Sequence, residues 1–272
     1  MNQGAAWPTL SVTARNRISD PRKKMHDPAV AQRMGFADGL VPGTVLYGYL
    51  LRPILARFGR DWLSGVVCDL DLPRPVTDGE ALTIRIQPAD GAMPRALRAA
   101  AVRDDGKPVA TLATTAPAPF PKPDPRYRLP SGAPPDHSRP LERDMLVAQN
   151  PFAAMVWTPS PKEQAGFCAE VEESLPLFHD EAPVAVHPAL IVRKANDTLV
   201  HQFRADFSIH VASRIVHHAP LLVGKPVEIR AVPEELWERN GHAYVRLYVA
   251  MLTGGRLAVE LNHTLIYRPR GS

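Results

Sequence analysis

An aspartate and a histidine near the start of the chain have the residue types needed for acid–base chemistry. Asp20 and His26 stand six residues apart in a polar stretch. A carboxylate and an imidazole that hold one water molecule can take a proton from it and return a proton to a neighbouring atom. Gly43 follows at the start of a predicted helix, where backbone N–H groups can stabilise developing negative charge. These three residues form the candidate catalytic group.

The chain contains one segment pattern twice, and only the first copy carries this pair. An offset of 145 residues aligns segment 41–86 with segment 186–231 without a gap. At the same offset, Ala165 and Val171 stand where the first copy has its aspartate and its histidine. A duplicated unit has a duplicated architecture, so we expect function where the copies differ.

Both copies show a buried helix followed by antiparallel strands with hairpin turns. This order predicts an α+β fold in which each helix packs against one curved sheet. The first copy has predicted helices at 27–34 and 43–58 and strands at 10–17, 65–74, 80–88, 95–104 and 107–117. The second has a predicted helix at 188–203 and strands at 207–219, 225–235, 242–253 and 256–268.

A proline-rich stretch separates the two copies. Nine prolines fall between residues 117 and 140, and proline is disfavoured in a helix interior and in a central strand, so a stretch this rich in proline should form neither. The stretch is therefore predicted to be an extended, semi-rigid linker. The predicted domains are a first repeat at 1–116, the linker at 117–145 and a second repeat at 146–272.

Composition narrows the functional class. The net charge of +4 is small and spread along the 272 residues, which disfavours a nucleic-acid-binding protein. No apolar run approaches the roughly 20 residues that cross a bilayer. The two cysteines form no metal-ligand pattern, so we expect no metal or other cofactor and a cytoplasmic location with free thiols.

The candidate catalytic group lies in a stretch that resembles a known motif. DPRKKMHDPAVAQRMGF, from Asp20 to Phe36, followed by Gly39-Leu-Val-Pro-Gly43, is similar to the hydratase motif of MaoC-like hotdog proteins. That family has Asp, His, Asp, Ala and Gly-Phe in this order before a glycine that opens the central helix. The repeat, the linker and the length look like those of its double-hotdog members. The resemblance implies a double hotdog, in which each curved sheet wraps around a central helix.

The resemblance also implies a reaction. It is the reversible addition of water to a 2-enoyl thioester, by an enoyl-thioester hydratase or 3-hydroxyacyl-thioester dehydratase. Asp20 and His26 would activate the water, and the Gly43 amide would hold the thioester oxygen. The substrate would be an acyl-CoA or an acyl-carrier-protein thioester, with no nucleic-acid or membrane partner, and a homodimer of such chains is compatible with the family. The expected substrate-binding residues are Pro42, Tyr47, His187 and Asn196.

Two other functions stay open. Asp197 with Asn262 loosely resembles the pair that holds the hydrolytic water in double-hotdog acyl-CoA thioesterases. A subunit that binds acyl thioesters without turnover is the third reading, because His26 stands one residue later than in the family motif and the Asn-Pro of that motif is absent.

Several of these residues also have purely structural readings. Asp20 before a proline is a common turn residue, Asp27 before Pro28 is a typical helix N-cap, and Gly43 can be a steric requirement. Strand alternation in the histidine-rich segment predicts that His210 and His218 share one face. Ser213 and His217 are predicted to share the other face.

Overall fold

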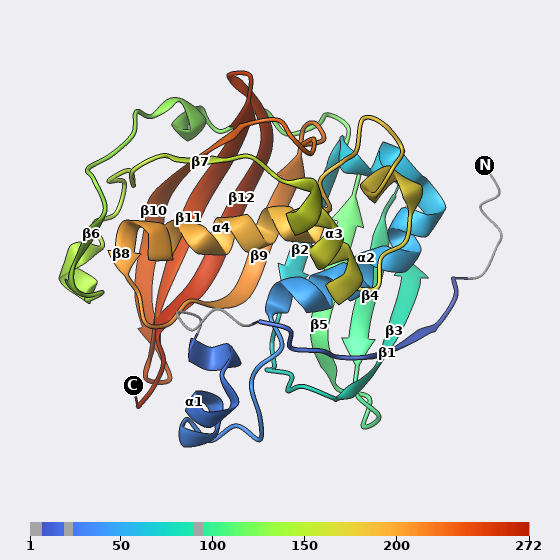
Figure 1. Cartoon of the computed structure of the whole chain (residues 1–272), viewed down its shortest axis with the longest axis horizontal. Helices are drawn as coiled ribbons and strands as arrows, with labels where there is room; N and C mark the ends of the chain where they lie inside the picture. The colour runs from blue at the N-terminus through green and yellow to red at the C-terminus, as the bar shows by residue number, and fades with distance from the viewer. Residues whose placement is uncertain (1–6, 19–23, 90–94, 272) are drawn as a thin grey trace.

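The computed structural model describes residues 7–18, 24–89 and 95–271. Two long helices lie across the concave side of one large curved sheet, with the N-terminal unit on one side of the molecule and the C-terminal unit on the other (Figure 1). The strands are β1 (Leu10–Thr13), β2 (Val66–Asp71), β3 (Ala81–Pro88), β4 (Leu97–Val102), β5 (Pro108–Thr115), β6 (Asp136–Pro140), β7 (Met155–Trp157), β8 (Phe203–Arg204), β9 (Ile209–His217), β10 (Val227–Arg239), β11 (His242–Thr253) and β12 (Arg256–Arg268). The α-helices are α1 (Pro28–Arg33), α2 (Gly43–Phe58), α3 (Pro161–Glu170) and α4 (Pro188–Gln202). Short 3-10 turns are η1 (Lys24–His26), η2 (Gly59–Leu63), η3 (Pro125–Arg128), η4 (Arg143–Met145) and η5 (Pro176–Phe178).

The large sheet is continuous across both repeats. Within the described ranges it has ten strands in the order β1-β3-β4-β5-β2-β9-β12-β11-β10-β7. All its pairs are antiparallel, and β2 pairs with β9 where the repeats meet. The predicted α+β class is confirmed.

The offset of 145 residues relates equivalent contacts as well as equivalent residues. Matching pairs occur at the isolated bridges and at the two outermost strand pairs of the large sheet. The isolated bridge Leu40–Thr77 of the first repeat corresponds to Ala185–Leu222 of the second. In the outermost strand pairs, Leu10–Ile84 of β1 and β3 corresponds to Met155–Ile229 of β7 and β10. The internal duplication is therefore structural, and it extends to segments outside the alignment read from the sequence.

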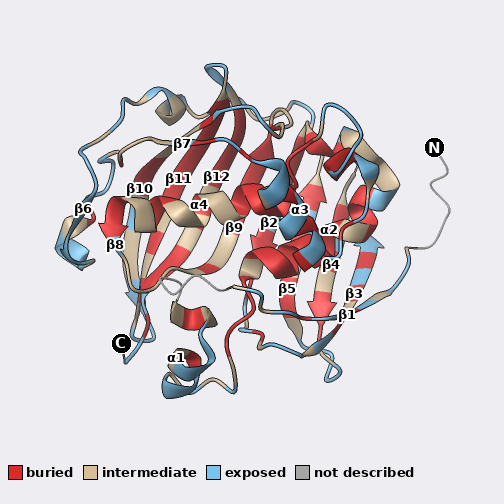
Figure 2. Ribbon diagram, viewed as in Figure 1, coloured by how far each residue is buried: buried red, intermediate tan, exposed pale blue. Residues whose placement is uncertain are grey.

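The two central helices form the middle of the core. Eleven of the sixteen residues of α2 are buried, and α2 packs beside α4 (Figure 2). Pro53 lies inside α2 without ending it. Asp27 caps α1 by accepting a hydrogen bond from the Val30 amide at 3.1 Å, with Pro28 in the first turn, as the N-cap reading predicts. None of the helices in the described ranges combines the length and apolar character needed to cross a membrane.

The proline-rich linker is extended and packs on the outer face of the second repeat. The Asp124 amide donates to Glu260 Oε1 at 2.8 Å, and the Tyr248 hydroxyl donates to the same atom at 2.7 Å. The linker also contains η3 and part of the small β6–β8 sheet. Its tertiary contacts therefore hold it in place along much of its length.

The edge strand β7 and the helix α3 of the second repeat are absent from the predicted set. The edge strand β7 has only three residues, too few for a clear alternation. The helix α3 begins after Ser160, whose hydroxyl accepts from the Glu163 amide at 3.1 Å. Ser160 and Glu163 have the spacing of a capping box, so the sequence does carry a signal for this helix.

Candidate functional site

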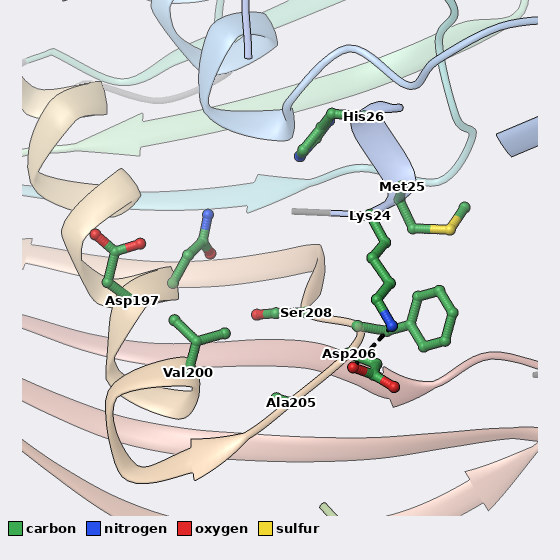
Figure 3. Close-up of a pocket in the computed structure, with 10 residues that line it drawn as sticks. Lys24, Met25, His26, Asp197, Val200, Ala205, Asp206 and Ser208 are labelled. Atoms are coloured by element: carbon green, nitrogen blue, oxygen red, sulfur yellow. Dashed lines mark ion pairs between the residues drawn. The ribbon is translucent and has the colours of Figure 1, made fainter. Parts of the chain in front are cut away.

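A small pocket lies where the N-terminal segment of the first repeat meets α4 of the second (Figure 3). Its volume of about 50 Å³ leaves room for a few water molecules or one reacting group, but not for a whole acyl chain. An ion pair between Lys24 and Asp206, at 2.9 Å, connects the two repeats beside it. The lining residues are Lys24, Met25, His26, Asn196, Asp197, Val200, Ala205, Asp206, Phe207 and Ser208.

His26 is held by the segment that leads into α2. Its Nδ1 lies 2.6 Å from the Leu40 carbonyl oxygen, which can only accept, so Nδ1 carries the proton. In the neutral imidazole the basic nitrogen is then Nε2. Backbone contacts fix the same turn, because the Leu40 amide donates to the Met25 carbonyl at 3.0 Å and the Asn16 side chain donates to the His26 carbonyl at 2.6 Å. The ring points into the pocket (Figure 3).

Gly43 is the first residue of α2 and follows Leu40 by three residues. Pro42 is the buried N-cap residue, and no side chain of the described residues caps the first turn. A Cβ at Gly43 would overlap the Leu72 side chain and lie 3.4 Å from His210 Nδ1. This close contact favours the steric reading of Gly43, and it is compatible with a second role for the backbone amide.

The other predicted substrate-binding residues lie in different places. Asn196, on α4, lines the pocket with His26. Tyr47 is completely buried inside the core and is not among the residues that line the pocket. His187 is also completely buried, at the start of α4, where its Nδ1 accepts from the Ala189 amide at 3.1 Å. Asp20 lies outside the described residues.

The structure does not bring the predicted hydrolytic pair together. Asp197 lines the pocket on α4, where Lys194 Nζ lies 3.5 Å from its carboxylate. Asn262 donates to Glu234 at 2.8 Å. Its strand neighbour His263 points toward α4, so Asn262 points to the opposite face of the sheet. The residues that do meet are Asn196 and His263, one position before and one position after the predicted pair.

The histidine-rich strand β9 differs from the prediction at His210. The pairing of β9 with β12 skips one residue between Ala212 and His210, opposite Thr264 and Leu265. Such a bulge moves the following side chain to the other face of the sheet. His210 Nε2 consequently lies 2.8 Å from Ser213 Oγ, and the predicted face shared with His218 is wrong.

His210 belongs to a line of polar side chains, joined by hydrogen-bond contacts, that the sequence analysis did not predict. Ser213 Oγ lies 2.7 Å from His263 Nδ1, and His263 Nε2 lies 2.6 Å from Asn196 Oδ1. This line of side chains therefore runs from His210, beside Gly43, to Asn196 in the pocket. The sequence shows the polar residues of β9 and β12, but the bulge in β9 decides that His210 lies on the same face as Ser213.

Comparison with known proteins identifies the fold. No protein-family model matches the sequence, and no curated protein matches it. A solved MaoC-like dehydratase is 14% identical, covers 97% of this chain and 98% of its own, and superimposes with a TM-score of 0.63. A Mycobacterium tuberculosis protein described as a double hotdog is also 14% identical, covers 96% of each chain and has a TM-score of 0.63. This chain is a double-hotdog protein. Its structure is similar to that of MaoC-like dehydratases, as its N-terminal motif predicts.

Thioesterases share the same double-hotdog architecture. An acyl-ACP thioesterase from Bacteroides thetaiotaomicron is 11% identical, covers 95% of this chain and 96% of its own, and has a TM-score of 0.51. Similarity at this level of identity concerns the fold. The reaction of this double-hotdog protein must therefore be inferred from its own site residues.

Buried histidines make the stability of the double-hotdog protein depend on pH. Burial lowers the pKa of His210 to about 3, although the Ala212 backbone acts in the opposite direction, and burial lowers the pKa of His217 to about 4. In the unfolded chain both titrate near 6.5. Below that pH the unfolded state binds protons that the folded state does not, so stability is lost as the pH falls from 6.5 toward 4.

We expect each buried histidine to contribute a slope of about 1.4 kcal/mol per pH unit in this range. Urea unfolding of wild type and His217→Gln between neutral and mildly acidic pH measures the contribution of one histidine. The variant should lose stability less steeply by about this amount. Equal slopes for the two proteins would show that His217 does not resist protonation in the folded state.

Proposed function

We propose that this chain acts on acyl thioesters and catalyses the reversible addition of water to the double bond of a 2-enoyl thioester. The observation that carries the proposal is the pocket that His26 and Asn196 both line, with His26 Nδ1 held by the Leu40 carbonyl just before α2. It offers a titratable base and a hydrogen-bond donor in one small space between the repeats. The double-hotdog fold, which MaoC-like dehydratases share, supports the same choice.

In this reaction the oxygen of water bonds to C3 of the acyl group and a proton is added to C2. His26 Nε2 takes a proton from the attacking water and returns one to C2, so the imidazole is regenerated. Asp20 would share the water with His26. Negative charge develops on the thioester oxygen, and the Gly43 amide, at the positive end of α2, would stabilise it there. Leu72 fills the space that a side chain at Gly43 would occupy.

Turnover assays test the proposal directly. Hydration is followed as loss of the absorbance of the conjugated thioester, with short and long 2-enoyl-CoA substrates. Hydrolysis is followed as free thiol released from saturated acyl-CoA substrates. The proposal requires hydration that exceeds hydrolysis, and it fails if no 2-enoyl substrate is hydrated.

Hydrolysis is the second candidate, because Asp197 and Asn196 both line the pocket and thioesterases share the fold. Thiol release without hydration would favour it. Binding of acyl-CoA with thermal stabilisation but no turnover would indicate a non-catalytic subunit. The cytoplasmic location, the acyl-CoA or carrier-bound form of the substrate and a homodimeric assembly remain predictions from the sequence.

A further inference from the structure

A continuous line of polar side chains crosses the apolar interior between α2 and the pocket. It runs from His210 through Ser213 and His263 to Asn196, over contacts of 2.8, 2.7 and 2.6 Å. His210, Ser213 and His263 are 7%, 3% and 0% exposed. Burying three polar side chains is costly unless they satisfy one another, so this arrangement is a specific feature of the fold.

The equivalent positions of the first repeat do not form such a line. At the offset of 145 residues, Leu51 matches Asn196 and Cys68 matches Ser213. Thr114, opposite Cys68 in the sheet as His263 is opposite Ser213, donates to the Arg95 carbonyl instead. The fold that the two repeats share therefore does not need these polar groups. Their role is confined to the second repeat.

The chemistry at the two ends of the line sets the direction of its hydrogen bonds. His210 Nδ1 is buried without a partner and lies next to Gly43, at the positive end of the α2 dipole. That field favours a lone pair on Nδ1 and disfavours a hydrogen there. His210 then donates from Nε2 to Ser213 Oγ, Ser213 donates to His263 Nδ1, and His263 donates from Nε2 to Asn196 Oδ1.

The orientation of the Asn196 amide follows from this direction. Its oxygen is used by His263, so its NH₂ group is the part left for the pocket that Asn196 and His26 line. A donor held rigidly in a small pocket is suited to an oxygen of a ligand.

We propose that the N-terminus of α2 polarises the line His210–Ser213–His263 so that Asn196 presents its amide NH₂ to an oxygen of the acyl-thioester substrate in the pocket that His26 also lines. Asn196 is the binding residue, and the other three are positioning residues that act through it. The identity of the ligand rests on the proposed function, whereas the direction of the hydrogen bonds does not.

The direction can be measured without any substrate. In wild-type protein with isotope-labelled histidine, NMR distinguishes protonated from bare ring nitrogens. The His210 and His263 signals are assigned by their loss in His210→Gln and His263→Gln. We expect both rings to be neutral, with hydrogen on Nε2 and none on Nδ1. Hydrogen on Nδ1 of either ring would overturn the proposed direction.

Kinetics test the role of Asn196. We expect Asn196→Ala to lower kcat/KM for 2-enoyl-CoA hydration about 10²- to 10³-fold, with most of the loss in kcat, because a preorganised donor beside the reacting group is removed. Ser213→Ala breaks the line without touching the pocket and should lower kcat about 10-fold with KM nearly unchanged. The matched control is His217→Gln, since His217 is also buried on β9 but is not part of the line. Equal effects of Ser213→Ala and His217→Gln on kcat would show that the line has only a structural role.

A binding measurement separates failure of this inference from failure of the proposed function. Butyryl-CoA is a saturated thioester that cannot be hydrated, and its dissociation constant can be measured even if the protein has no hydratase activity. Asn196→Ala should weaken its binding about 2- to 10-fold, the value of one hydrogen bond. Hydration by wild type together with unchanged butyryl-CoA binding and unchanged kcat in Asn196→Ala would overturn the role of Asn196 alone.

Discussion

Replacement of His26 by glutamine is expected to lower kcat/KM for hydration of a 2-enoyl-CoA by about 10²- to 10⁴-fold, because general acid–base catalysis contributes this much. Glutamine has no basic nitrogen that could take the proton from water. The loss should be largely in kcat, since the reacting proton is transferred only in the transition state. Initial rates at saturating and limiting substrate measure both constants.

Two further variants separate proton transfer from the structural role of His26. His26→Asn can keep a donor at the position of Nδ1, which bonds the Leu40 carbonyl, but it has no titratable group. It should be as inactive as His26→Gln. His137→Gln, an exposed histidine of the linker, should retain wild-type rates. An active His26→Asn would mean that His26 only supports the loop and that the base lies elsewhere.

Replacement of Arg193 by leucine is expected to cost about 3–5 kcal/mol of folding free energy, because it leaves a buried carboxylate without its cation. Arg193 Nη1 lies 2.7 Å from Glu170 Oε2, and the two side chains are only 15% and 7% exposed. The guanidinium also stacks over the Phe167 ring at 4.5 Å and donates to the Thr44 hydroxyl of α2 at 3.3 Å. Arg193 thus connects α3, α4 and α2. Chemical denaturation of wild type and variant gives the difference.

A neighbouring ion pair supplies the matched control. Arg52 pairs with Glu172 at 3.0 Å, but Glu172 is 54% exposed, so Arg52→Leu should cost less than about 1 kcal/mol. The double variant Arg193→Leu with Glu170→Leu removes both buried charges and should recover most of the lost stability. A cost for Arg193→Leu as small as that for Arg52→Leu would contradict the predicted penalty for leaving the buried Glu170 carboxylate unpaired.

Much of the fold can be predicted from one sequence, because each repeat follows simple local rules. Buried apolar residues at helical spacing predict α2 within its observed bounds, and Asp27 before Pro28 predicts the start of α1. The offset of 145 residues then relates the repeats without any tertiary information. Short elements such as β7 could not be found this way, since three residues carry no measurable period.

The candidate site was predictable only in part. His26 and Asn196 were both singled out from the sequence, and both line the pocket. Tyr47 and His187 were singled out too, but each is completely buried away from it. The sequence shows which residue types are present and how they are spaced, but distances between side chains of different repeats depend on how the two repeats pack together.

The sequence by itself determined the duplication, the order of helices and strands, and the motif that contains His26. Only the tertiary structure decided which polar groups meet. One extra residue in β9 moves His210 to the face of Ser213, and the packing of α4 on β12 brings Asn196 to His263. The physical reason is that local patterns reflect the period of a helix or strand. A bulge changes that period for a single residue, and contacts between repeats depend on the whole folded chain.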